Sequence, residues 1–249
     1  MSLLGVFESE CLIKKLKLID IENVGNIDWS EYHNIIEKLN IQSHYSAKTK
    51  HDEYVVNQLI LYNKVGLLVN DLIVTEIWKD KVFPLILNDI NEEISTKLYM
   101  ILFHEGTLVN LLQIILYHSS SVEMETEYML ELCDYCNRKM DSMLSGKVSN
   151  KDFYEYTSID DAKEETVSQK LERQGRHIEF NICANVISVL RFITDHITKT
   201  SVSVVQRIIN KHDIVMKLIG LMEKRVFTKI DKDKNILKFN NNKIKYTKY

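Results

Sequence analysis

Apolar residues recur along most of this chain with the spacing of amphipathic helices. In residues 165–198, for example, Val186, Val189, Leu190 and Ile193 stand three or four positions apart, so their side chains share one helix face. The sequence has only one proline and seven glycines, so few positions interrupt helices. The pattern predicts helices at about residues 6–19, 52–63, 67–80, 93–104, 107–118, 123–144, 165–198, 201–211 and 213–224, with a further helix capped by Ser30.

Two segments break this helical pattern. Pro84 lacks a backbone N–H and restricts the backbone of Phe83, so we expect a helix to end or kink there. Residues 145–165 lose the apolar period and become acidic from Ser158 to Glu165. This change predicts a loop between two helices.

The C-terminal residues follow a different pattern. Residues 235–239 are partly apolar, residues 243–246 alternate between apolar and polar, and three asparagines separate the two runs. Such a pattern predicts a β-hairpin, which needs support from other parts of the protein because a lone hairpin is marginally stable. The chain therefore divides into a helical domain at residues 1–224 and a basic tail at residues 225–249.

One internal similarity bears on how the helices are arranged. Gly66–Leu72 and Gly106–Leu112 share the glycine, a central Leu-Val-Asn and the final leucine, at an offset of 40 residues. Armadillo and HEAT repeats have about 40–47 residues, and each helix pair must stack on its neighbours to bury its apolar face. Two short motifs can also match by chance. We predict an all-α fold, an armadillo/HEAT-like stack of helix pairs with a small C-terminal β-hairpin.

Charge is distributed unevenly along the chain. Residues 224–249 hold nine basic and two acidic residues and so carry +7, which leaves −10 for residues 1–223 out of a net charge of −3. An acidic body repels nucleic acid, so we expect no nucleic-acid binding. The basic tail is either a solvated surface or a site for an acidic partner.

Two absences narrow the class of protein. No run of about 18 consecutive apolar residues occurs, so we expect no membrane insertion. The four cysteines do not suggest a disulfide framework, which favours a reducing, cytoplasmic location.

No set of residues has the spacing of a catalytic or metal site. Cys133 and Cys136 form one CxxC pair, but a structural zinc site usually needs a second pair. His104 and Glu105 begin an HExxH motif, yet Leu108 stands where the second histidine is required. We therefore predict neither an enzyme nor a cofactor or metal. Trp29 and Trp78 are predicted to be core residues.

Several runs resemble a known family, the MYND-type zinc-finger dynein axonemal assembly factors. Trp29–Gln42 is similar to the family segment W-x-x-x-H-x-x-x-E-K-L-N-x-Q. Each run alone is weak, but five in the same order are specific. The others are Ile77–Pro84, Tyr99–Leu112, Asp134–Lys139 and Ser188–Asp195.

This resemblance implies an armadillo-like N-terminal region and a co-chaperone role in the cytoplasmic preassembly of axonemal dynein arms. The implied partners are axonemal dynein heavy chain, heat-shock chaperones and other assembly factors, among them a leucine-rich-repeat protein. The chain ends before any Cys/His-rich finger, so we expect an N-terminal fragment or a shortened homologue without zinc. Functions of the finger do not carry over.

Charged or titratable residues in the matching runs are our candidates for partner contact on the surface. Each of them is equally compatible with a structural hydrogen bond or a solvated charge. One alternative function is a generic armadillo-like adaptor unrelated to cilia, and another is an enzyme that uses His104–Glu105 or the cysteine pair. The candidate residues are Lys79, Lys81, His104, Glu105 and Arg191.

Overall fold

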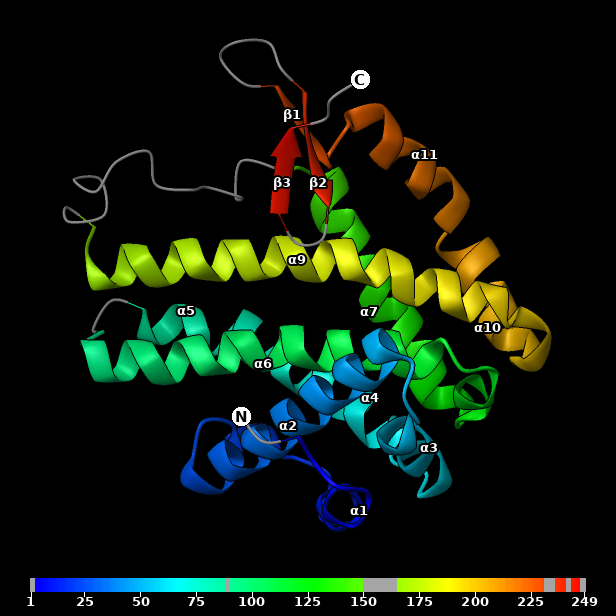
Figure 1. The fold of residues 1–249 in the computed structure, drawn as a ribbon. Coiled ribbons are helices and arrows are strands. Elements are labelled where there is room, and N and C mark those ends of the chain that lie inside the picture. Colours follow the sequence, from blue (N-terminus) through cyan, green and yellow to red (C-terminus); the bar gives the residue numbers. More distant parts are fainter. Residues whose placement is uncertain (1–2, 88–89, 150–164, 231–235, 241–242, 247–249) are drawn as a thin grey trace.

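The protein is mainly helical, as the sequence predicts (Figure 1). The computed structural model describes residues 3–87, 90–149, 165–230, 236–240 and 243–246. Its α-helices are α1 (Val6–Lys14), α2 (Ile27–Thr49), α3 (Tyr54–Leu61), α4 (Val65–Lys81), α5 (Phe83–Ile86), α6 (Glu92–Leu116), α7 (Thr126–Leu144), α9 (Val167–Asp195), α10 (Val202–Gln206) and α11 (Ile214–Lys224).

Short turns of other helix types join several of these elements. Segments of 3₁₀-helix occur at Ile21–Asn23, Ser119–Glu123 and Ile197–Lys199, and a π-helical turn at Arg207–Lys211 follows α10. These segments let the chain change direction with few extra residues.

A small antiparallel sheet follows the last helix. Strand β2 (Ile236–Asn240) lies between β1 (Thr228–Ile230) and β3 (Lys243–Tyr246). In register, Thr228 pairs with Lys238, and Phe239 pairs with Ile244. The strands lie in the segment for which the sequence predicts a hairpin, but residues 241–242 of the predicted asparagine turn lie outside the described residues.

The two longest helices, α6 and α9, run side by side in the same direction (Figure 1). A Cβ added to Gly175 would lie 3.2 Å from Leu102, within the first half of both helices, and Asn185 donates to Asn110 at 2.6 Å further along. Near the end, an imidazole nitrogen of His196 lies 3.0 Å from the backbone oxygen of Tyr117. The parallel packing thus extends over most of both helices.

Helix α6 is also the centre of the core. It contacts α2 and α4 as well as α9, and its buried residues include Leu108, Leu111, Leu112 and Ile115. By length and composition alone α6 is apolar enough to cross a membrane. Its apolar side chains are instead largely buried inside this fold, as expected of a central helix.

Two predicted helix boundaries are wrong. The sequence predicts separate helices at residues 93–104 and 107–118, but α6 is continuous through Gly106. Glycine inside a helix costs only about 1 kcal/mol relative to alanine, so Gly106 does not have to end the helix. The second helix begins at Ile27 rather than after Ser30, because the Asn26 side chain accepts the backbone N–H of Trp29 at 2.7 Å.

Other predicted features are confirmed. Helix α4 ends at Lys81, and Pro84 lies in the first turn of α5, where its missing N–H is tolerated. Trp29 and Trp78 are buried in the core. The long helix α9 starts at a capping box formed by Thr166 and Gln169.

Of the predicted loop at residues 145–165, residues 150–164 lie outside the described residues.

The two copies of the glycine motif do not occupy equivalent positions. Gly66 lies in the first turn of α4, whereas Gly106 lies in the middle of α6. A Cβ on Gly66 would come within 2.4 Å of the Tyr128 ring, so close packing between helices explains this glycine. The armadillo-like stack therefore stays a prediction, as does the division into a helical domain and a tail.

Candidate functional site

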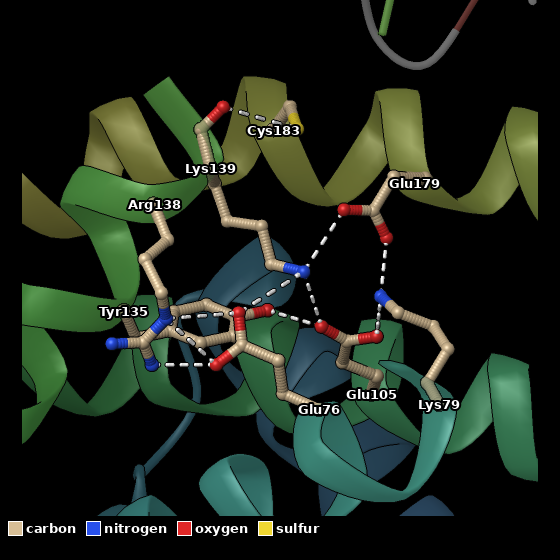
Figure 2. A network of polar contacts seen from close by, with 8 residues as sticks. All are labelled: Glu76, Lys79, Glu105, Tyr135, Arg138, Lys139, Glu179 and Cys183. Carbon is tan, nitrogen blue, oxygen red and sulfur yellow. Dashed lines mark hydrogen bonds and ion pairs between the residues drawn. The ribbon is translucent and has the colours of Figure 1, made fainter. Parts of the chain in front are cut away.

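Charged side chains from four helices meet in the interior between α4, α6, α7 and α9. Figure 2 shows three carboxylates and three cations joined by a continuous set of contacts. We call this set the ion-pair network. Its members are Glu76 and Lys79 of α4, Glu105 of α6, Arg138 and Lys139 of α7, and Glu179 of α9.

Lys139 is the central cation of the ion-pair network. Its side chain is only 4% exposed, and its Nζ lies 2.7 Å from Oε1 of Glu105 and 2.9 Å from Oε1 of Glu179. Oε1 of Glu76 lies further away, at 3.6 Å. The same ammonium group lies over the Tyr135 ring, 4.9 Å from its centroid. One lysine on α7 therefore links α4, α6 and α9.

Glu105 is the most deeply buried carboxylate of the set. One of its oxygens accepts from Lys139 and also from the Tyr135 hydroxyl at 2.8 Å, and the other accepts from Lys79. Lys79 in turn donates to Oε2 of Glu179 at 2.5 Å. Both oxygens of this buried carboxylate are thus hydrogen-bonded, which a charge in the interior requires.

Arg138 extends the network towards the surface. Its guanidinium contacts Oε2 of Glu76 through Nη2 at 2.5 Å and Nε at 3.1 Å. The Arg138 side chain is 45% exposed, while Glu76 is 7% exposed. The guanidinium therefore shields an inner carboxylate from solvent while its outer edge remains hydrated.

The pKa shifts in the network follow from its charge balance. Burial by itself raises the pKa of Glu179, but the charges of Lys139 and Lys79 outweigh it and lower that pKa to about 2. The same balance between burial and these lysines lowers the pKa of Glu105. Burial opposes the charged form of Lys139, yet Glu105, Glu179 and Glu76 raise its pKa well above the usual range. All three groups are therefore ionised at neutral pH.

A second polar cluster lies between α2, α4 and α6. Nδ1 of His33 is 2.8 Å from Nδ1 of His104, and Nε2 of His104 is 2.9 Å from Oδ2 of Asp71. The Trp29 ring stacks on His33 with centroids 5.4 Å apart and meets His104 edge-on. We call these four residues the imidazole cluster.

The imidazole cluster holds its histidines largely away from water. Burial, together with the neighbouring His104, lowers the pKa of His33 to about 4, so that His33 is neutral at pH 7. A neutral His33 fits the geometry, because an Nδ1 to Nδ1 hydrogen bond needs one donor and one acceptor. Two buried atoms of the cluster, Nε1 of Trp29 and Oδ1 of Asp71, have no hydrogen-bond partner among the described residues.

The structure separates the five residues predicted to contact partners. It brings Lys79 and Glu105 together in the ion-pair network and places His104 in the imidazole cluster. Lys81 is exposed near the end of α4, and Arg191 is exposed on α9, where it lies 3.5 Å from Asp195.

The predicted surface position of His104 and Glu105 is wrong. Both residues are fully buried, because α6 is covered by α2, α4 and α9. Their polar groups find partners inside the protein, so neither side chain is available for contact with another protein in this conformation.

Sequence reasoning missed Lys139, Glu179 and Asp71. A signal for Lys139 was present, since it shares a helix face with the buried residues Cys136, Met140 and Met143. A lysine inside an apolar stripe needs a buried counter-ion. The sequence does not show which carboxylate provides it, because Glu105 and Glu179 lie 34 and 40 residues away along the chain.

Neither polar cluster has the geometry of a metal site. Among the described residues, no group of three or more His, Cys, Asp and Glu side chains is arranged to hold a metal ion. Cys133 and Cys136 are buried in α7, and burial, with the charge of Asp134, raises the pKa of Cys133 to about 12. A buried neutral thiol is a poor metal ligand and a poor nucleophile.

The ion-pair network holds α4, α6, α7 and α9 together. Lys139 and Arg138 hold α7 against α4, α6 and α9, while Lys79 joins α4 to α6 and α9. Interactions of this kind are directional, so they favour one relative position of the four helices. A small cavity of about 280 Å³ borders Lys79 and Glu179 and is the network's opening towards the surface.

The chain is similar to a curated protein of Drosophila melanogaster, the zinc finger MYND domain-containing protein 10 homolog. The two are 32% identical over 208 residues, which is 83% of this chain. This chain is a homologue of zinc finger MYND domain-containing protein 10. The family resemblance seen in the sequence is thereby confirmed.

The similarity covers part of the relative only. The matched region is 46% of the Drosophila protein, so the chain spans about half the length of that zinc finger MYND domain-containing protein. No family model matches the chain. No solved structure matches it either.

Proposed function

We propose that this chain is a non-catalytic protein-binding scaffold that acts as a co-chaperone in the cytoplasmic preassembly of axonemal dynein arms. The observation that carries the proposal is the similarity to the zinc finger MYND domain-containing protein 10 homolog over 83% of the chain. With 208 residues matched, that similarity includes most of the helical body, so the proposal assigns the binding role to this body.

The proposed mechanism is passive. Stacked helices of the armadillo/HEAT type present an extended surface, and equivalent helices of successive units then run parallel. The parallel packing of α6 and α9 supports this arrangement. The ion-pair network supports it further, because a rigid surface loses less conformational entropy when a partner binds.

The proposed partners are axonemal dynein heavy chain, heat-shock chaperones and other assembly factors. The test is affinity purification of the tagged chain from the cytoplasmic fraction of ciliating cells, followed by mass spectrometry. We expect dynein heavy chain and heat-shock chaperones to be enriched over a tag-only control. Recovery of other proteins without any dynein chain would instead support an armadillo-like adaptor unrelated to cilia.

A matched variant separates specific binding from capture of an unfolded chain. Lys139→Met is expected to disrupt the helical body, whereas Lys97→Met alters only an exposed pair with Glu93 at 3.1 Å. Dynein chain should be lost with the first variant and kept with the second. Chaperones that bind unfolded protein should increase with Lys139→Met, which identifies non-specific capture.

A further inference from the structure

An open groove lies at the end of the molecule where α2, α6 and α9 finish. It has a volume of about 690 Å³ and lies far along α6 from the ion-pair network. We call it the end groove. Its lining residues are His44, Ala47, Lys48, Lys50, His51, Glu53, Gln113, Ile114, Tyr117 and Phe192.

We propose that the end groove binds an acidic peptide segment that carries an aromatic or aliphatic side chain. The proposal rests on the function proposed above, since it names the chemistry of one partner of the scaffold. Cations on the rim would pair with the acidic residues, and the apolar floor would take the apolar side chain.

Two exposed lysines stand on the rim of the end groove, on a body that carries net negative charge. Lys48, Lys50 and His51 are exposed and lie within four residues of one another. Among the described residues, neither Lys48 nor Lys50 forms an ion pair with a protein carboxylate, in contrast to the lysines of the ion-pair network. Their charges are therefore open to a partner.

The acidic residue in the lining has a hydrogen-bond partner within the protein. Glu53 places Oε2 at 2.5 Å from Nε2 of His118, so its carboxylate is occupied by a neighbour from the segment after α6. One oxygen of this carboxylate is therefore held within the protein and does not point freely at an incoming peptide.

The floor of the groove is apolar and aromatic. The rings of Tyr117 and Phe192 meet edge-on with centroids 5.6 Å apart, and Ile114 lies beside them on α6. Tyr117 is 64% exposed, which leaves a large aromatic surface uncovered. The Arg191 guanidinium lies 5.8 Å from the Phe192 ring centroid, next to this floor, and its Nε is 3.5 Å from Oδ2 of Asp195.

A simpler role for the lysines is to complement the negative C-terminal end of α2, where Lys48 lies in the last turn and Lys50 follows it. The chain provides a control for that role. Lys15 and Lys17 are exposed at the C-terminal end of α1 with the same spacing, but they do not line the groove.

The experiment measures binding of a short fluorescein-labelled peptide of aspartate and glutamate with one phenylalanine and one leucine, by fluorescence anisotropy. The same peptide with asparagine and glutamine in place of the acids is the neutral control. We expect the acidic peptide to bind at least about tenfold more tightly at low salt, and its affinity to fall as salt is raised.

Variants of the protein test whether the peptide binds in the end groove. The double variant Lys48→Glu/Lys50→Glu should weaken acidic-peptide binding by about tenfold or more, while Lys15→Glu/Lys17→Glu should change it less than about twofold. Tyr117→Ala should weaken binding by about fivefold, whereas Phe7→Ala, an exposed aromatic on α1, should not. Circular dichroism melting of every variant confirms that each is folded.

Equal binding of the acidic and neutral peptides would overturn the proposal, as would equal weakening by the two lysine double variants. The peptide-binding test and the co-purification test can give different results. If the peptide fails to bind while dynein chain still co-purifies, the groove proposal is wrong and the scaffold proposal stands. If the peptide binds but no dynein chain co-purifies, the groove proposal stands and the scaffold proposal is wrong.

Discussion

The ion-pair network and the imidazole cluster both lie against α6, yet they bury polar groups differently. In the network, three cations face three carboxylates, and the contacts keep the charges of Lys139 and Glu179 in place. In the cluster, burial favours the neutral form of His33, and two polar atoms have no partner among the described residues.

The comparison shows what each region contributes. Balanced charges are tolerated in the interior only while each has its partner. Removing one of them should therefore sharply lower the free energy of unfolding. In the imidazole cluster, burial favours a neutral His33, so this region becomes unfavourable when acid adds a proton to that ring. The first region is therefore sensitive to mutation and the second to pH.

The largest effect is expected from Lys139→Met. This change leaves the buried carboxylates of Glu105 and Glu179 without their central cation, so the free energy of unfolding should fall by about 3–5 kcal/mol at pH 7. Urea denaturation followed by circular dichroism measures the loss. The exposed control Lys97→Met should cost less than about 0.5 kcal/mol, and an equal loss in both variants would contradict a special role of the network.

A second variant tests whether the loss comes from unpaired charge. Lys139→Met combined with Glu105→Leu removes one charge of each sign and leaves Lys79 paired with Glu179. Because buried ion pairs are often replaceable by apolar side chains at little cost, the double variant should be more stable than Lys139→Met by about 1–3 kcal/mol. The same urea titration applies, and additive losses would argue against coupling of the two residues.

The third effect depends on pH. His33 binds a proton at about pH 4 in the folded protein but near 6.5 when unfolded, so its contribution is complete above pH 6.5 and is lost as pH falls towards 4. Between pH 6.5 and 5 the loss is about 1.6 kcal/mol. The variant His33→Gln should flatten this slope in urea titrations at several pH values. The variant His51→Gln, at an exposed histidine, should keep the slope.

The smallest effects are expected at the two predicted partner residues that are exposed. Lys81→Ala and Arg191→Ala should each change the free energy of unfolding by less than about 0.5 kcal/mol, since exposed ion pairs such as Arg191–Asp195 contribute little. Thermal melting checks this. Any loss of partner binding in these variants can then be attributed to the surface itself.

Local patterns predicted the helices well and their ends less well. The apolar period located α4, α7 and α9 because each has one face on the core. The expected break near Gly106 was wrong because one glycine costs a helix interior only about 1 kcal/mol, and α6 packs against α2, α4 and α9. The Asn26 cap was missed because serine and asparagine are equally good caps and both occur there.

The candidate site was only partly predictable. Lys79 and Glu105 were singled out for their place in family-like runs, but no sequence pattern indicated that they pair with each other. Their partners Lys139 and Glu179 come from helices that reach the site only after tertiary packing. A charged residue on an otherwise apolar helix face was the available signal, and it identifies a buried ion without identifying its counter-ion.

The parallel course of α6 and α9 restricts where the chain can change length. Two parallel helices need a return segment between them, and α7, which carries Lys139, lies on that return path. Each residue inserted in a helix turns everything after it by about 100° around the axis. An insertion within α7 before Lys139 would therefore point the lysine away from Glu105 and Glu179, so insertions and deletions among homologues should avoid this helix.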